Sequence, residues 1–111
     1  MTTREKANQI FNSAVAAAQP AQLIPVHLFI EDRVLHIFDQ EFLMKELQNV
    51  YVIGAGKASA AMAKTAEEIL GGLITEGIVV TKYEHSILLQ KIICLEAAHP
   101  VPDENGVAAT T

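Results

Sequence analysis

One segment constrains the fold more than any other: residues 50–59, with the sequence VYVIGAGKAS. Four apolar residues are followed by two glycines with one residue between them, then by a lysine and the start of an Ala-rich run. A short apolar run bounded by glycine is typical of a buried strand, and an Ala-rich run favours a helix. The segment therefore predicts a strand covered on both faces, a tight turn and a helix, which indicates an α/β fold.

The turn has the chemistry of an anion site. Gly54 and Gly56 lack a Cβ atom and can adopt positive φ, so the main chain can turn sharply and expose its N–H groups. The helix that follows leaves its first amides without intrahelical partners and adds the positive end of its dipole. Lys57 brings a mobile full charge. The alternative is that the glycines serve only close packing of strand against helix, since Gly-x-Gly alone is a weak motif.

Composition narrows the classes of partner. The 111 residues carry a net charge of −5, and 50% are hydrophobic. We therefore expect one small ordered domain that does not bind nucleic acid. Residues 10–30 lack charged side chains but include two prolines and several polar residues, so we expect no membrane span. Cys94, the only cysteine, lies in an apolar run, which predicts a core residue and a reducing, cytoplasmic location.

Patterning elsewhere predicts the remaining elements. A capping box, Thr2-x-x-Glu5, begins an amphipathic N-terminal helix that ends near Pro20. Strand, helix and strand after residue 50 predict a parallel crossover. The other expected elements are a short connection or helical turn at 22–25, a two-stranded hairpin over 27–38, a loop with a short helix over 39–49, a helix over 59–70, and buried strands over 78–81 and 92–96.

A polar loop follows the last predicted strand. His99 lies at the carboxyl edge of the sheet, where ligands bind in open α/β folds, and Pro100 would restrict its backbone. A site role and a purely structural role remain open for His99. Asp103 is expected to cap a final helix. Because that helix starts so near the last residue, we expect the sequence to be a fragment of a longer protein.

Two common nucleotide motifs do not match. In a dinucleotide fingerprint Ser59 would stand where Gly or Ala is usual, and Glu76 precedes the second strand instead of ending it. A Walker A loop is excluded because Ala58 follows the lysine. Polar residues after the second strand fit a solvated loop, and no His, Cys or carboxylate set has metal-ligand spacing. These loop residues are Lys82, Glu84, His85 and Ser86.

Two motifs together, GAGKASAAMA at 54–63 and EAAHPVPDENG at 96–106, resemble the N-terminal part of the glycerate 2-kinase family, whose members were often labelled hydroxypyruvate reductases. The resemblance implies an α/β fold with a Rossmann-like parallel sheet and flanking helices, preceded by an N-terminal helix and a hairpin. Residues 1–111 would form an incomplete N-terminal α/β domain of a larger two-domain enzyme, whose active site lies in the cleft between its domains.

The resemblance also implies a reaction. Members phosphorylate D-glycerate at its 2-hydroxyl with ATP and Mg²⁺, giving 2-phosphoglycerate. The family's lysine in the Gly-rich turn corresponds to Lys57, expected to be catalytic and to contact the transferred phosphoryl group or the substrate carboxylate. We expect Gly54, Gly56, Ser59 and His99 to complete the substrate and phosphate site. The later Gly/Ser-rich loop and the C-terminal domain of the family are missing, so we expect no activity from this chain alone.

Two alternatives remain. The Gly-x-Gly turn also suits an NAD(P)-dependent hydroxypyruvate reductase. A non-catalytic chain that associates with itself through exposed strand edges is the other alternative, and on the same ground we expect a homo-oligomer.

Overall fold

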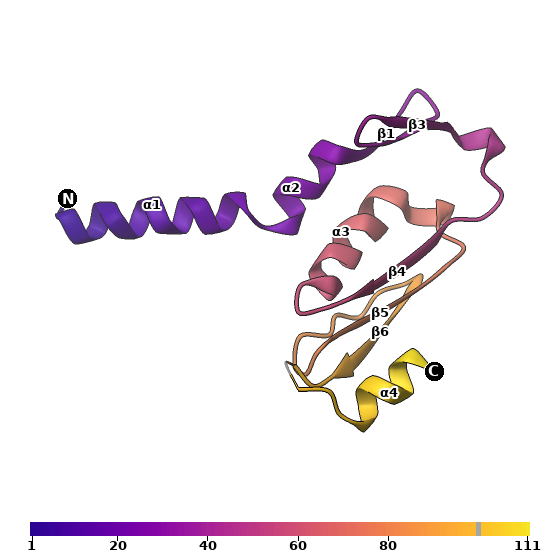
Figure 1. Ribbon diagram of the computed structural model, residues 1–111. Helices are drawn as coiled ribbons and strands as arrows, with labels where there is room; N and C mark the ends of the chain where they lie inside the picture. Colours follow the sequence, from indigo (N-terminus) through magenta and orange to yellow (C-terminus); the bar gives the residue numbers. More distant parts are fainter. Residues whose placement is uncertain (100) are drawn as a thin grey trace.

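The chain forms two three-stranded sheets flanked by helices, and the computed structural model describes residues 1–99 and 101–111 (Figure 1). The first sheet is antiparallel and the second is parallel. Pro100, expected to restrict His99, lies outside the described residues. The elements are α1 (Thr3–Ala17), α2 (Pro20–His27), β1 (Leu28–Glu31), β2 (Val34–Ile37), β3 (Gln40–Leu43), β4 (Tyr51–Ala55), α3 (Ser59–Leu70), β5 (Glu76–Lys82), β6 (Ile92–Ala97) and α4 (Glu104–Thr110), with 3₁₀ turns at Met44–Glu46 and Gly71–Leu73.

The parallel sheet confirms the predicted α/β fold. Its strand order is β4-β5-β6, with β5 in the centre. Side chains alternate between the two faces of each strand, and the register places Gly54 beside Val79 on one of them. That face packs on α3, whereas α4 lies against β6 on the opposite side (Figure 1). The carboxyl ends of all three strands therefore meet at one edge of the sheet.

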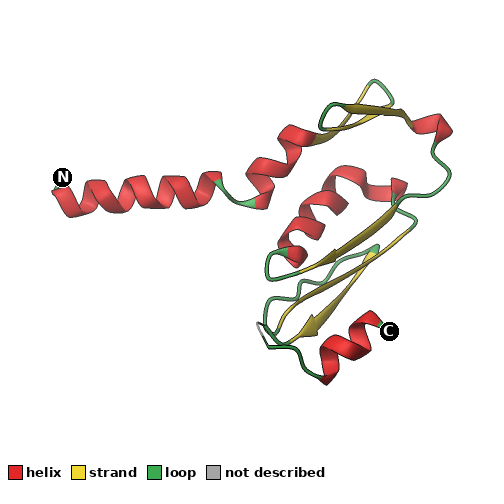
Figure 2. Cartoon of the chain, viewed as in Figure 1, coloured by secondary structure: helices red, strands yellow, loops and turns green. Residues whose placement is uncertain are grey.

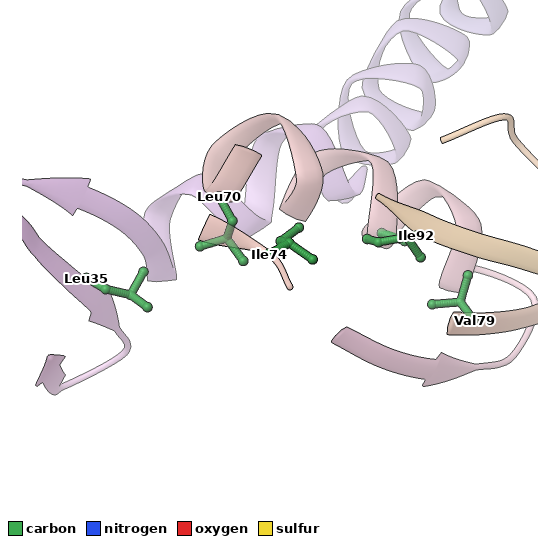
Figure 3. Close-up of a cluster of buried hydrophobic side chains, with 6 residues drawn as sticks. Leu35, Leu70, Ile74, Val79 and Ile92 are labelled. Carbon is green, nitrogen blue, oxygen red and sulfur yellow. The ribbon is translucent and has the colours of Figure 1, made fainter. Parts of the chain in front are cut away.

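The core lies between α3, the parallel sheet and the hairpin (Figure 3). Val79 is 2% exposed, so the centre of β5 is fully covered. Cys94 packs against this cluster, which confirms its prediction as a core residue. The buried members are Leu35, Ala63, Leu70, Ile74, Val79 and Ile92.

The N-terminal region differs in part from expectation. The capping box at Thr2 and Glu5 is confirmed, and α1 extends away from the sheets with no buried residue (Figure 2). Residues 22–25, predicted as a short connection or a helical turn, are helical, but the prediction fell short of the full element, because α2 runs from Pro20 to His27 and packs on α3. Proline suits the first turn of a helix, since its missing N–H is not needed there. The predicted loop at 39–49 was wrong in its first half, where β3 extends the hairpin.

The prediction that residues 50–53 form a strand covered on both faces was wrong about the cover. The side chain of Val52 faces α3, and Gly54 lies on the same face, but the side chains of Tyr51 and Ile53 point to the other side, where Ile53 is 82% exposed. Contacts of α4 within the parallel sheet are concentrated on β6, so no helix of the described chain covers β4 on that side.

Candidate functional site

The Gly-rich turn joins β4 to α3 at the carboxyl edge of the parallel sheet. Its two glycines do different work. A Cβ atom on Gly54 would lie 3.3 Å from Cγ1 of Val79, so this glycine permits the close packing of β4 beside Val79. Gly56 has φ of +122°, a backbone conformation that other residues rarely adopt, with no atom near its missing Cβ. The turn therefore depends on Gly56 for its shape and on Gly54 for its packing.

Lys57 occupies the exposed part of this turn. The one contact between a basic and an acidic side chain found among the described residues joins His36 to Glu41, so no carboxylate there neutralises Lys57. No side chain caps the N-terminus of α3, which begins two residues later. An uncapped helix start carries partial positive charge on its free amides. Lys57 and the start of α3 thus place positive charge at the same edge of the sheet.

Two buried hydroxyl groups, those of Ser59 and Thr81, join the turn to the end of β5. Ser59, 7% exposed, places its Oγ 2.8 Å from the carbonyl oxygen of Gly56 and 2.9 Å from that of Val80. Thr81, 2% exposed, donates from Oγ1 to the carbonyl oxygen of Lys57 at 3.1 Å. The amide of Gly56 also donates to the Val80 carbonyl, at 2.9 Å. The end of β5 therefore bonds to the main chain of the turn at Gly56 and Lys57 and to the side chain of Ser59.

These contacts concern one predicted site residue, Ser59, and one residue that was not predicted, Thr81. The hydroxyl of Ser59 is directed to main-chain carbonyls, so its prediction as a phosphate ligand stays a prediction. Sequence reasoning missed Thr81. Its one signal was a hydroxyl residue at the end of the apolar run Ile78–Val80, where a buried strand position needs a partner for that hydroxyl.

His99 lies at the same edge but further along it. It is exposed and follows β6, whereas Lys57 follows β4, and β5 separates the two strands. Neighbouring strands are about 4.8 Å apart, so the two strand ends are separated by roughly 10 Å. The structure thus places both residues on one edge of the sheet, but after strands that are not neighbours. A site role for His99 stays a prediction.

A hydrogen-bonded network orders the loop that carries His99. The hydroxyl of Tyr83 donates to Oδ2 of Asp103, and Asn105 donates to the Tyr83 oxygen at 2.8 Å. Asp103 Oδ1 also accepts from the amide of Gly106, which confirms Asp103 as the cap of α4. The bond between the two side chains raises the pKa of Tyr83 above its ordinary 10.0 and lowers that of Asp103 below 3.8. The network links the end of β5 to the start of α4.

Glu84 and Ser86, in the loop after β5, both bond to Glu96 of β6. The carboxylate of Glu96 accepts from the Ser86 hydroxyl at 2.7 Å and from the Glu84 amide at 3.2 Å, so it orders the loop after β5. Glu76 starts β5 opposite Tyr51, at the amino end of the strands. It is therefore far along the strand from the Gly-rich turn and cannot bind a ribose there.

A groove of about 630 Å³ runs beside β4, between α2, the hairpin and α3. It reaches Gly54 and Ser59 at one end, but it is lined almost entirely by apolar side chains. Such a lining does not suit a phosphate group.

Among residues 1–99 and 101–111, no three potential ligands lie close enough together to bind a metal ion. No helix in the same ranges has the length and apolar character of a membrane span.

Known proteins resemble this chain over nearly its whole length. Residues 6–111 match the family described as a domain of unknown function, DUF4147. The Glycerate 2-kinase of Pyrococcus horikoshii is 35% identical over 107 residues, which are 96% of this chain and 23% of the relative. The D-glycerate 2-kinase of Thermotoga maritima is 48% identical over 65 residues, 58% of this chain and 16% of the relative. An Agrobacterium vitis relative named as a candidate hydroxypyruvate reductase is 36% identical over 109 residues, which are 98% of this chain and 22% of the relative.

Solved structures agree with these sequences. A crystal structure from Pyrococcus horikoshii superposes with a TM-score of 0.78 at 34% identity and covers 98% of this chain and 24% of its own. A glycerate kinase from Thermotoga maritima gives a TM-score of 0.69 at 35% identity, covering 94% and 22%. The chain spans less than a quarter of the length of these proteins. It belongs to the DUF4147 family, the family of its glycerate kinase relatives.

Proposed function

We propose that this chain supplies the phosphate-binding turn of an ATP-dependent D-glycerate 2-kinase. The enzyme would transfer the terminal phosphoryl group of ATP to the 2-hydroxyl oxygen of D-glycerate, giving 2-phosphoglycerate and ADP. The observation that carries the proposal is Lys57, an exposed lysine in a turn with a positive-φ glycine, at the edge of a parallel sheet where ligands bind. The names of the glycerate kinase relatives support the substrate.

Charge explains why this turn suits phosphoryl transfer. The chain carries a net charge of −5, so an anionic substrate meets an unfavourable overall field and needs local positive groups. Lys57 and the positive end of the α3 dipole supply them. Phosphoryl transfer needs positioning and neutralisation of charge on the phosphoryl oxygens more than covalent chemistry. Lys57 would therefore bind the transferred group, with Gly54 and Gly56 shaping the main chain around it.

Mg²⁺ would neutralise the nucleotide phosphates when bound. Mg²⁺ often binds through substrate phosphates with one or two carboxylates, so a full protein cage is not required. Because the described residues form no such cage, the contribution of this chain is Lys57 and the turn. His99, about two strand spacings away, would contact a more distant part of the bound substrates. We place the protein in the cytoplasm, where ATP is abundant.

The test is substitution of Lys57 in the full polypeptide that carries these residues. Lys57→Ala should lower glycerate-dependent ADP formation by about 100-fold or more, since removal of one donor to a developing charge costs that much. Lys64→Ala is the matched control, because Lys64 is also exposed but lies on the body of α3. Unchanged activity of Lys57→Ala would contradict the proposal.

The reductase alternative is separated in the same assay. Addition of NADH and hydroxypyruvate should give no loss of nicotinamide absorbance if the kinase proposal is correct. The geometry gives a reason for this expectation: Glu76 lies at the amino edge of the sheet, so the strand beside the Gly-rich turn lacks an acidic residue to bind a ribose. Rapid NADH oxidation would favour the reductase.

A further inference from the structure

We infer that Thr81 is a positioning residue for the proposed phosphate site, acting through the main chain of Lys57. Its hydroxyl donates to the carbonyl oxygen of Lys57 at 3.1 Å and is 24 residues away in sequence. Within residues 1–99 and 101–111, this contact is the one side-chain hydrogen bond to the lysine that we propose binds phosphate. The inference therefore rests on the proposed function of Lys57.

Burial makes the contact rigid. Thr81 is 2% exposed and its side chain lies on the face of β5 that packs on α3, so water does not compete for the hydroxyl. A buried hydroxyl without a partner would be costly, and the Lys57 carbonyl satisfies it. As a β-branched residue, Thr81 also has few accessible χ1 rotamers. The hydroxyl is thus fixed before any substrate arrives.

The surrounding bonds show why one hydroxyl matters. Val80, the preceding residue, accepts from the Gly56 amide and from the Ser59 hydroxyl, on either side of Lys57 in sequence. These bonds fix the two ends of the turn. Lys57 lies between them in an exposed stretch, and its own peptide is attached to β5 through Thr81. Loss of that bond frees the carbonyl of Lys57 to rotate, which moves the origin of its side chain.

The direction of the Lys57 carbonyl also affects the charge beside the proposed anion site. A carbonyl that turned outward would present partial negative charge beside the proposed anion site. The Thr81 hydroxyl directs this oxygen inward, toward β5, and leaves the exposed side of the turn to N–H groups and the ammonium. Thr81 therefore affects both the position of Lys57 and the sign of the charge beside it.

The experiment compares Thr81→Val, which removes the hydroxyl and keeps the shape, with Thr81→Ser, which keeps the hydroxyl. Both are made in the full polypeptide that carries these residues, and kcat and KM are measured for D-glycerate and ATP. Thr81→Val should lower kcat/KM by about 10- to 100-fold, the effect of a small displacement of a reacting or binding group. The loss should fall on the same parameter, kcat or KM, as in Lys57→Ala, and Thr81→Ser should restore it.

Thr65→Val is the matched control. Thr65 is also buried, and its hydroxyl donates to the Ala61 carbonyl of its own helix at 3.3 Å, so the substitution removes a similar bond elsewhere. It should leave the kinetics unchanged. In a Lys57→Ala background, Thr81→Val should cause a much smaller loss, because the ammonium group that it positions is absent and only the effect of the main-chain carbonyl remains.

The outcomes separate the two proposals. If Lys57→Ala is inactive and Thr81→Val is fully active, or equally damaging with and without Lys57, the inference on Thr81 is overturned while the proposed function stands. If Lys57→Ala is fully active, the proposed function itself fails. Should Thr81→Val not fold, the pair Thr81→Ala and Thr81→Ser isolates the hydroxyl instead. A protein that folds only with a hydroxyl at position 81 would show a role in folding, which also overturns the inference.

Discussion

At the scale of single residues, the two glycines of the turn at 54–57 are needed for different reasons, which the Gly-x-Gly pattern alone does not distinguish. Gly54 is needed because a Cβ atom would press on Val79, and Gly56 because its backbone is in a region reserved for glycine. The first requirement concerns the neighbour, which can shift by a few tenths of an ångström. The second belongs to the backbone itself, so no movement of neighbours relieves it.

We therefore predict that Gly56→Ala lowers the free energy of unfolding by about 1–3 kcal/mol, the usual cost of holding a residue in such a region. Its added methyl group meets no atom, so the whole effect is backbone strain. Gly72→Ala is the control, since that glycine also has open space but no positive φ. Urea denaturation followed by circular dichroism measures both. Equal stability of the two variants would be inconsistent with strain at Gly56.

At the scale of elements, the start of β6 depends on α3 through one carboxylate. Glu67 accepts from the amides of Gln90, Lys91 and Ile92 at 2.7, 3.0 and 3.2 Å. Partial burial disfavours its charge, but the three amides outweigh this effect and lower its pKa below the ordinary 4.5. The sheet and the helix are therefore joined at the amino end of β6 by a bond that needs an ionised side chain.

The sign of the pH dependence follows from the lowered pKa. Stabilisation by Glu67 is complete above the unfolded value of 4.5 and is lost as pH falls through the lower folded value. At pH 7, Glu67→Gln should cost about 1–2 kcal/mol of unfolding free energy. The difference from the unchanged protein should shrink in acid. Glu68→Gln, an exposed neighbour on α3, should show neither effect in the same urea titrations. A deficit of Glu67→Gln that persists unchanged in strong acid would contradict the account.

Elements with local signals could be predicted from the sequence. The capping box predicted the start of α1, two apolar runs on either side of residues 31–33 predicted the hairpin, and the apolar runs after residue 50 predicted the parallel strands. The full length of α2 and the strand β3 could not be predicted, because their stability comes from contacts distant in sequence: α2 packs on α3, and β3 pairs with β2. The turn was predicted from its glycines and Lys57. Its bond to Thr81 spans 24 residues and has no local pattern.

At the scale of the whole molecule, the chain is extended. Its radius of gyration is 17.0 Å, whereas a compact domain of about 100 residues has about 13 Å. Much of the difference reflects α1, which extends away from the sheets (Figure 1). The face of the parallel sheet opposite α3, which α4 covers at β6 but not at β4, has a further consequence. Four large apolar side chains of that face are exposed: Tyr51, Ile53, Ile78 and Ile93.

We predict that the 111-residue chain associates with itself through this apolar face, because such patches are rarely left in water by monomers. Ile53, 82% exposed at the centre of the edge strand β4, is the position to change. Ile53→Lys should move the mass measured by light scattering toward that of one chain, since a charge on this face opposes its burial. Leu88→Lys is the control, as Leu88 is fully exposed but lies in the loop before β6, and it should leave the mass unchanged. A strictly monomeric unchanged protein would rule out this association, and the exposed face would then be tolerated by the isolated chain.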